Sequence, residues 1–564
     1  MHLRKMEATD ESAILPDPNL PRFVSSCRRT FGDLCYDALS RYGFLSLLLL
    51  LALVFTRSIY ESHQKALWFD EIFTAIVATQ PTWHRFAQAM PADGNPPLYA
   101  LLTRLSIHLF GLTDLAIRLP SILSFLAVLA GVYVFVRREC GVVFGLLAVV
   151  LTFSEPGWTY SFEARPYALL TAFMMLALVS WQSAVHAAEA TPPRPRRLAL
   201  AGMVVGIVGC MLSHDIGIVE VGVPLLFGEA MRLYRTRCPD WPVLATALTA
   251  IPALAITLPM MRRTSDLLLT YAHAAMRPLT LAKLHQYWID NPKPSLPLVL
   301  NSNLIEITAI IILVSWTPRW LNRSRTVIPA HAEEGTPVRP PAHIIAAALG
   351  AALLVPATML AMMFSTGYYN CRYGIGCIAG IAMLSCLLLA RDGRRQCTIC
   401  LSLIAFLVLI YAHVCIAEIR HRHGQAEDIA PVFSSDRSGL SIVISDPFNY
   451  IRTWWYASPT MKNQIVYLTD KSTAVQQGYE VTEVALTFEK PLISARLENC
   501  NGFLAAHDHF LLGTDGDVRF LFLKDRLEGA GYRATLLRSD GFNNIYDMQR
   551  IMLPGIGDPV NTSR

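Results

Sequence analysis

The chain has 564 residues, of which 53% are hydrophobic and only 16% are charged. A soluble domain typically carries about 25% charged residues, so this composition excludes a protein that is soluble throughout. The formal net charge of +5 is small for this length and gives no reason to expect nucleic acid as a partner.

The apolar residues come in blocks that are long enough, or nearly so, to cross a lipid bilayer. A transmembrane helix needs about 20 residues, and helices satisfy their own backbone polar groups in lipid. We therefore expect a polytopic α-helical membrane protein with about 11, and up to about 13, transmembrane helices. The expected spans cover roughly residues 43–60, 115–136, 141–158, 165–185, 198–216, 218–233, 241–260, 300–318, 343–364, 372–390 and 398–416.

The charges between the blocks predict the orientation. Arginines gather in alternate loops, and the N-terminal arm, residues 1–42, is also basic. Because Lys and Arg favour the cytoplasmic side, we expect the N-terminus in the cytoplasm and, after an odd number of crossings, the C-terminal region outside. The outer loop after the seventh span counts against this orientation, because it carries Arg262, Arg263 and Arg277.

Two regions flank or interrupt the expected membrane domain, residues 43–418. The outer loop 61–114 contains an apolar stretch, 97–110, that is too short to span, so we interpret it as a helix lying on the outer face. The second region, residues 419–564, is ordinary soluble sequence. Its short apolar runs alternate with helical patterns, which predicts a small extracytoplasmic α/β domain with strands at 441–445, 464–467 and 510–513 and helices at 447–457 and 516–530.

Polar residues at the ends of spans are informative, because holding them beside lipid costs free energy. Asp70 and Glu71 follow the first span and stand beside aromatic residues. Close carboxylates near a low dielectric have raised proton affinity, which suits a general base. The alternative is purely structural, since Asp and Glu are also favoured in the first turn of a helix.

Two further elements have both a structural and a functional interpretation. In the segment 93–99, Asn95 and the two prolines that follow predict a turn and then a helix start, before Tyr99. In the segment 160–167, Glu163 and Arg165 can pair with each other at the membrane edge. Arg165 can equally grip a phosphate through its planar fork of donors.

The last two elements are Arg372 with Tyr373, and His214 with Asp215. Arg372 stands among aromatic residues, which suits either an interfacial anchor or a second phosphate ligand. A single His-Asp pair serves either as a structural hydrogen bond or as a catalytic dyad. In the expected topology all of these elements fall on the outer membrane face, together with the soluble domain, which favours a reaction site there.

These motifs resemble, in content and order, the GT-C superfamily of membrane glycosyltransferases, and most closely the branch of the protein O-mannosyltransferases and the lipid A aminoarabinose transferase. The motifs are the acidic pair 70–71, Pro-Pro-Leu-Tyr at 96–99, Arg-Leu-Pro-Ser at 118–121, Glu-Ala-Arg-Pro-Tyr at 163–167 and Arg-Tyr at 372–373. Beyond about residue 170 the match is mainly one of hydropathy. The chain has Phe162 where members often have Gln, and Asn95 where they often have His.

The resemblance implies that an acceptor hydroxyl attacks the anomeric carbon of a polyprenyl-phosphate sugar, usually with inversion. Asp70 would be the general base, and Glu71 would position the acceptor or tune Asp70. Arg165 and Arg372 would stabilise the leaving phosphate. The supporting residues would be Glu163, which would orient Arg165, together with Tyr167, Asn95, Tyr99, His214 and Tyr373.

The resemblance also implies partners and a location. The acceptor would be a glycan, lipid or protein of the cell envelope, and the protein would lie in a bacterial inner membrane with its C-terminal domain in the periplasm. No cofactor is certain, although the pair Asp70 and Glu71 also suits a divalent metal ion. The rival hypotheses are a transporter or flippase for a lipid-linked or polar envelope component, and a membrane-anchored binding protein.

Overall fold

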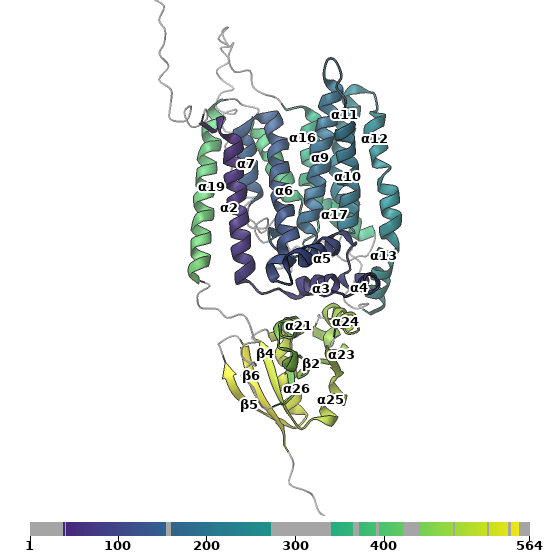
Figure 1. Ribbon diagram of the computed structural model, residues 1–564, viewed down its shortest axis with the longest axis vertical. Helices are drawn as coiled ribbons and strands as arrows, with labels where there is room; N and C mark the ends of the chain where they lie inside the picture. Colours follow the sequence, from purple (N-terminus) through teal and green to yellow (C-terminus); the bar gives the residue numbers. More distant parts are fainter. Residues whose placement is uncertain are drawn as a thin grey trace, which may run out of the picture.

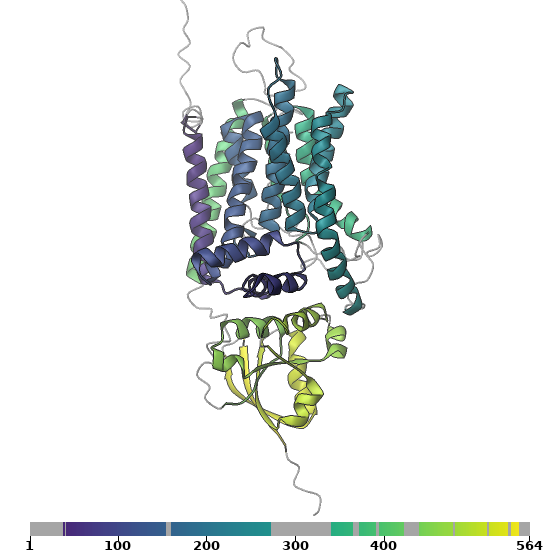
Figure 2. The same cartoon turned by 45° about the vertical axis from the view of Figure 1, so that its right-hand side comes forward.

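The computed structural model shows a helical bundle with an α/β unit at one end of it (Figure 1, Figure 2). The described residues are 38–39, 41–153, 160–271, 340–364, 372–390, 394–421, 439–477, 480–493, 495–515, 518–539 and 543–551. The expected span at 300–318 and the N-terminal arm up to residue 37 lie outside them.

Four helices of the described part are long and apolar enough to cross a membrane. They are α2 (Gly43–Gln64), α6 (Asp114–Cys140), α9 (Tyr167–Glu189) and the segment Trp241–Arg262, which joins α12 (Trp241–Ala247) to α13 (Ala250–Tyr271). The other helices of the bundle are α7 (Val142–Thr152), α10 (Arg197–Ser213), α11 (Gly217–Thr236), α16 (Ala342–Ala352), α17 (Leu354–Phe364), α18 (Cys377–Leu389) and α19 (Arg394–His421). The chain is a polytopic membrane protein.

The span expected at 343–364 is bent rather than straight. Helices α16 and α17 meet at an angle of 53°. Pro356 stands in the first turn of α17 and has no N–H to donate to the Ala352 carbonyl, so the helix is interrupted at Leu353.

Small residues let the bundle helices approach closely. A Cβ atom placed on Gly206 of α10 would lie 2.6 Å from the backbone nitrogen of Ala177 in α9. A Cβ atom on Gly380 of α18 would lie 2.3 Å from backbone atoms of Ala351 in α16. Close helix contacts of this kind take the place of the hydrophobic driving force, which is lost between helices in lipid.

Three short helices lie crosswise between the bundle and the α/β unit: α3 (Phe69–Ala78), α4 (Trp83–Asp93) and α5 (Leu98–Phe110) (Figure 1, Figure 2). Gly94 ends α4 with a φ of 69°, in the left-handed region that favours glycine. Pro97 is the cap residue of α5, so the sequence Asn-Pro-Pro makes the turn that its residues predict. Helix α5 is the apolar stretch that the sequence places on the outer face.

The α/β unit contains one mixed sheet with the strand order β3-β2-β1-β4-β6-β5. Strands β3, β2, β1 and β4 are parallel, and β6 and β5 add an antiparallel hairpin. The strands are β1 (Ile442–Ile444), β2 (Ile465–Thr469), β3 (Arg496–Asn499), β4 (His509–Asp515), β5 (Tyr532–Ser539) and β6 (Asn543–Arg550). The helices are α21 (Pro447–Tyr456), α22 (Pro459–Lys462), α23 (Lys471–Gln477), α24 (Glu480–Glu489), α25 (Cys500–Ala506) and α26 (Val518–Gly529).

The α/β unit docks on the bundle through α21, which packs against α3. Buried side chains from both helices form one apolar cluster, in which Phe69 and Ile72 meet Ile451 and Trp454. The rings of Phe69 and Phe448 lie 5.0 Å apart in an edge arrangement. Helix α3, which carries Asp70 and Glu71, is therefore held between the membrane bundle and the C-terminal domain.

Candidate active site

Helix α3 is fixed at its first turn by a buried ion pair between Glu71 and Arg118 of α6. Arg118 donates from Nε to Glu71 Oε1 at 2.8 Å and from Nη2 to Glu71 Oε2 at 2.6 Å. The Glu71 carboxylate also accepts from the backbone N–H groups of Ala164 at 2.7 Å and Trp68 at 3.1 Å. Both side chains are at most 1% exposed, so the Glu71 carboxylate faces the protein interior and is satisfied there.

Arg118 also stabilises the connection between α2 and α3 through hydrogen bonds to its backbone. Its guanidinium donates to the carbonyl oxygens of Ser62 at 3.0 Å, Lys65 at 2.6 Å and Ala66 at 3.0 Å. The cluster of backbone carbonyls and the Glu71 carboxylate thus satisfies a fully buried cation. This arrangement sets where α3 begins, and therefore where Asp70 points.

Asp70 lies in a cluster of ionic side chains on the other side of α3. Its Oδ2 atom accepts from Arg372 Nη1 at 2.8 Å and lies 3.9 Å from Arg165 Nε. Arg165 Nη1 lies 3.2 Å from Asp93 Oδ1, and Arg372 Nη1 lies 3.7 Å from Glu163 Oε1. Segments that are far apart in the sequence therefore supply two guanidinium groups and three carboxylates to one place.

Two atoms of this cluster are buried without a hydrogen bond. They are Arg165 Nε and Glu163 Oε1. Arg165 Nε can still donate one hydrogen bond. Because a buried donor without a partner is costly, binding an acceptor there would be favourable. Arg372 also stacks on the ring of Trp68, with its guanidinium carbon 4.3 Å from the ring centre, which fixes the plane of its donors.

Burial shifts the titration of several groups at the site. It raises the pKa of Glu163 to about 7, although the positive charge of Arg372 acts in the opposite direction. It raises the pKa of Asp215 to about 7 as well, with a further contribution from the negative charge of Asp93. Burial and the nearby Arg165 cation lower the pKa of His214 to about 3, so this imidazole is neutral at physiological pH.

Asn95 and Tyr99 hold segments that carry members of the ionic cluster, and Asn95 also donates to the Asp93 carboxylate at 3.4 Å. Asn95 donates to the Asp93 carbonyl at 2.9 Å and so stabilises the turn that places Asp93. The Tyr99 hydroxyl lies 2.7 Å from Ser121 Oγ, and Ser121 donates to the Arg165 carbonyl at 3.1 Å.

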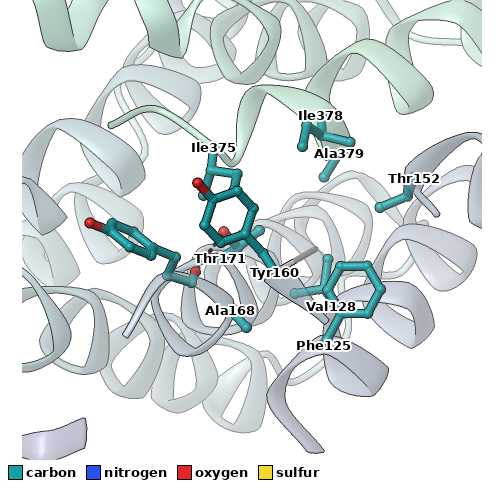
Figure 3. A pocket seen from close by; sticks show the side chains of 10 residues that line it. Phe125, Val128, Thr152, Tyr160, Ala168, Thr171, Ile375, Ile378 and Ala379 are labelled. Atoms are coloured by element: carbon teal, nitrogen blue, oxygen red, sulfur yellow. Dashed lines mark hydrogen bonds between the residues drawn. The ribbon is translucent and has the colours of Figure 1, made fainter. Parts of the chain in front are cut away.

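Aromatic rings from three segments of the bundle pack together. The Tyr167 and His214 rings lie 5.4 Å apart, and the His214 and Tyr373 rings 5.5 Å apart. Tyr160 packs edge-on against Tyr167. Tyr160 and Tyr167 also line a cavity of about 20 Å³, enough for one water molecule, whose other walls are mostly apolar (Figure 3).

A larger apolar cavity of about 690 Å³ lies between α10, α11, α12, α13 and α17. Its lining includes Met211 and Ile218, which flank the loop that carries His214. The rest of the lining is almost entirely aliphatic, with Glu229 as its charged member. A cavity of this size and character fits hydrocarbon chains.

Two important residues were not among the site residues that the sequence predicted. Asp93, which is buried, pairs with Arg165 and accepts a hydrogen bond from Thr74 at 2.9 Å. Arg118 belongs to the Arg-Leu-Pro-Ser motif, which by itself indicates no role for this residue. Its position near the start of an apolar span was the available signal, since a charge there needs an internal partner.

The pair Asp70 and Glu71 does not fit a divalent metal ion in this structure. The two carboxylates face opposite partners, because Glu71 is saturated by Arg118 and backbone N–H groups while Asp70 pairs with Arg372. In the described part of the chain, no group of three or more His, Cys, Asp or Glu side chains is placed to hold a metal ion.

Residues 94–261 match the model of the dolichyl-phosphate-mannose-protein mannosyltransferase family. This segment includes Glu163, Arg165 and His214, but neither Asp70 nor Arg372. A search of curated proteins gave no match.

Two solved structures of ArnT from Cupriavidus metallidurans are similar over most of the chain. The one bound to undecaprenyl phosphate has 13% identity and a TM-score of 0.53, and covers 90% of this chain and 98% of its own. The one in the apo state has 12% identity and a TM-score of 0.54, and covers 89% and 97%. The chain therefore has the fold of these two structures, and this finding and the partial family match both support the GT-C resemblance that its motifs indicate.

Proposed function

We propose that this protein is a glycosyltransferase that moves a sugar from a polyprenyl-phosphate donor to an acceptor hydroxyl at the outer face of the membrane. One observation carries the proposal above all. Two arginines from separate segments converge on the Asp70 carboxylate, at the end of a GT-C bundle, with one buried arginine donor still without a hydrogen bond. This arrangement joins a candidate base to a binding site for an anion.

Arg165 and Arg372 are the proposed ligands of the donor phosphate. Guanidinium groups bind phosphate oxygens with two parallel donors, and the Trp68 ring and the Asp93 carboxylate fix the orientation of the two side chains here. The apolar cavity between α10, α11 and α17 is the proposed site for part of the lipid tail. The solved relative that is bound to undecaprenyl phosphate supports this class of donor.

Asp70 is the proposed general base. It would take the proton of the acceptor hydroxyl while the hydroxyl oxygen forms a bond to the anomeric carbon. The bond between that carbon and the phosphate oxygen would break, and its electron pair would leave with the polyprenyl phosphate. Arg165 and Arg372 would stabilise the added negative charge, and a single displacement of this kind inverts the anomeric centre.

Glu71 takes a different role in this proposal from the one its position beside Asp70 suggests. Because its carboxylate is buried against Arg118, it would position Asp70 rather than contact the acceptor. Asp93 would orient Arg165, and the protonation state of Glu163, which lies 3.7 Å from Arg372, would set how available Arg372 is to the phosphate. Tyr167, His214 and Tyr373 would support the loops that carry these groups.

The test is donor turnover by purified protein in nanodiscs, with radiolabelled polyprenyl-phosphate sugars and bacterial envelope extract. We expect Asp70→Asn to lower turnover by about a hundredfold or more, as the loss of a general base does. The matched control is Asp508→Asn, because Asp508 is an exposed acidic residue that pairs with Arg550 in the C-terminal domain. Near-parental turnover in Asp70→Asn would remove Asp70 from the mechanism.

The same experiment separates the proposal from a transporter or flippase. No turnover of any donor by folded protein would contradict the transferase and would favour transport of a lipid-linked component. We also propose a bacterial inner membrane as the location, with the N-terminus cytoplasmic and the C-terminal domain periplasmic. Reporter fusions at the two termini check this orientation, and the acceptor is named by the envelope fraction that takes up label.

A further inference from the structure

The hydroxyl of Tyr456 joins three parts of the protein at the start of α3. Tyr456 is the last residue of α21 in the C-terminal domain. Its oxygen accepts a hydrogen bond from the backbone N–H of Leu67 at 2.8 Å. Its proton goes to Oδ2 of Asp114, the first residue of α6, at 2.6 Å.

The two hydrogen bonds reinforce each other. A hydroxyl that donates to a carboxylate makes a short, charge-assisted bond, and its oxygen becomes a better acceptor. Burial, together with this bond to Asp114, raises the pKa of Tyr456, so the hydroxyl keeps its proton. Leu67 is fully buried, so its N–H depends on a protein acceptor.

The contact completes the fixation of the connection between α2 and α3. Arg118 holds the carbonyls of residues 62, 65 and 66, and Glu71 accepts from the N–H of Trp68. The N–H of Leu67 is the group that the C-terminal domain holds. Asp114 and Arg118 stand one turn apart on α6, so the same helix holds Tyr456 through Asp114 and the backbone carbonyls through Arg118.

The fixed segment lies directly before the proposed catalytic groups. Trp68 follows Leu67 and stacks on Arg372, and Asp70 stands two residues later. A shift of the Leu67 backbone therefore moves the base and one phosphate ligand together. We propose that Tyr456 is a positioning residue, through which the C-terminal domain sets Asp70 against Arg372 for transfer; this inference rests on the proposed function.

The experiment compares Tyr456→Phe with the matched control Tyr450→Phe. Both tyrosines belong to α21 and both variants keep the ring, but the Tyr450 hydroxyl bonds to the Arg496 carbonyl inside the C-terminal domain. We expect Tyr456→Phe to lower kcat by about tenfold or more while the KM for donor stays within about twofold, since misplaced catalytic groups act on the chemical step. Tyr450→Phe should leave both constants unchanged.

Hydrogen exchange at the amide of Leu67 gives a readout that does not depend on turnover. We expect exchange to be faster by about tenfold or more in Tyr456→Phe and unchanged in Tyr450→Phe. Asp114→Ala should give smaller effects of the same sign, because the Tyr456 oxygen can still accept from Leu67, and it should add little in the Tyr456→Phe background.

The outcomes that overturn the inference differ from those that overturn the proposed function. Unchanged exchange at Leu67 would show that the hydroxyl does not hold the segment. Faster exchange with an unchanged kcat would show a contact without a positioning role. A raised KM at constant kcat would assign Tyr456 to donor binding instead. A parent protein that turns over no donor would overturn the proposed function, and with it positioning for transfer, while exchange still reports on the contact itself.

Discussion

The substitution Arg118→Lys tests whether the buried ion pair holds α3 in place. Arg118 makes five hydrogen bonds, two to the Glu71 carboxylate and three to backbone carbonyls. A lysine ammonium keeps the charge but has only three donors on one nitrogen. At least two of these acceptors would therefore lose their donor.

The magnitude follows from those acceptors. A buried acceptor without a donor costs about 1–3 kcal/mol, so two of them cost about 2–6 kcal/mol. The Lys65 and Ala66 carbonyl contacts are only partly buried, which favours the lower half of this range. We expect the free energy of unfolding to fall by about 2–4 kcal/mol.

Pulse proteolysis across an SDS titration in mixed micelles measures this change. The control is Arg496→Lys, because Arg496 is a partly exposed arginine that pairs with Glu498 in the C-terminal domain and should stay within about 0.5 kcal/mol of the parent. If Arg118→Lys unfolds at the same midpoint as this control, the ion pair does not stabilise α3 and the reasoning is wrong.

Two further predictions concern the proposed phosphate ligands. Arg165→Ala should raise the KM for donor more than Arg165→Lys, because lysine keeps the positive charge but not the paired donors; equal and negligible effects in a donor titration would leave Arg165 a purely structural role. The KM for donor should rise by about tenfold as the pH rises through about 7, which is the raised pKa of Glu163. Below that pH the Glu163 carboxyl is neutral. Above it the carboxylate is ionised and competes with the donor phosphate for Arg372. Glu163→Gln should remove this pH dependence, and a parental profile in that variant would contradict the assignment.

The charged residues at the ends of spans could be predicted as a site because they stand out against apolar sequence. Asp70, Arg165 and Arg372 lie within one cluster in the structure, although 302 positions separate the first from the last. The membrane topology explains why these residues come together, because it sorts loops onto two faces before any contact is known. The sorting places residues on the same face, but it does not pair them.

The pairing itself could not be predicted. Adjacent residues on a helix do not face each other, so Asp70 and Glu71 point to different partners once α3 forms. The sequence nevertheless presents them as a pair, which suggested a shared catalytic or metal role. Arg118, the partner of Glu71, is 47 positions away and carries no local signal of that contact.

The C-terminal domain shows a similar limit. Strands β1, β2 and β4 coincide with apolar runs of the sequence, because they are central and largely buried. Strand β5 is the exposed edge of the sheet and mixes apolar with polar and charged residues, so its sequence has no buried-strand pattern. The role of Tyr456 depends on docking against α3, which no pattern within the domain predicts.

The exposed fractions of the carboxylates in the ionic cluster indicate which ion pair an incoming phosphate would separate. The Asp93 side chain is fully buried in its pair with Arg165, whereas the Asp70 side chain is 27% exposed in its pair with Arg372. Because separating a buried pair leaves an uncompensated charge, the pair of Asp93 and Arg165 should persist. The phosphate would then accept a hydrogen bond from Arg165 Nε, which makes none now, and would displace Asp70 from Arg372. Donor binding would thereby release the carboxylate that takes the proton of the acceptor.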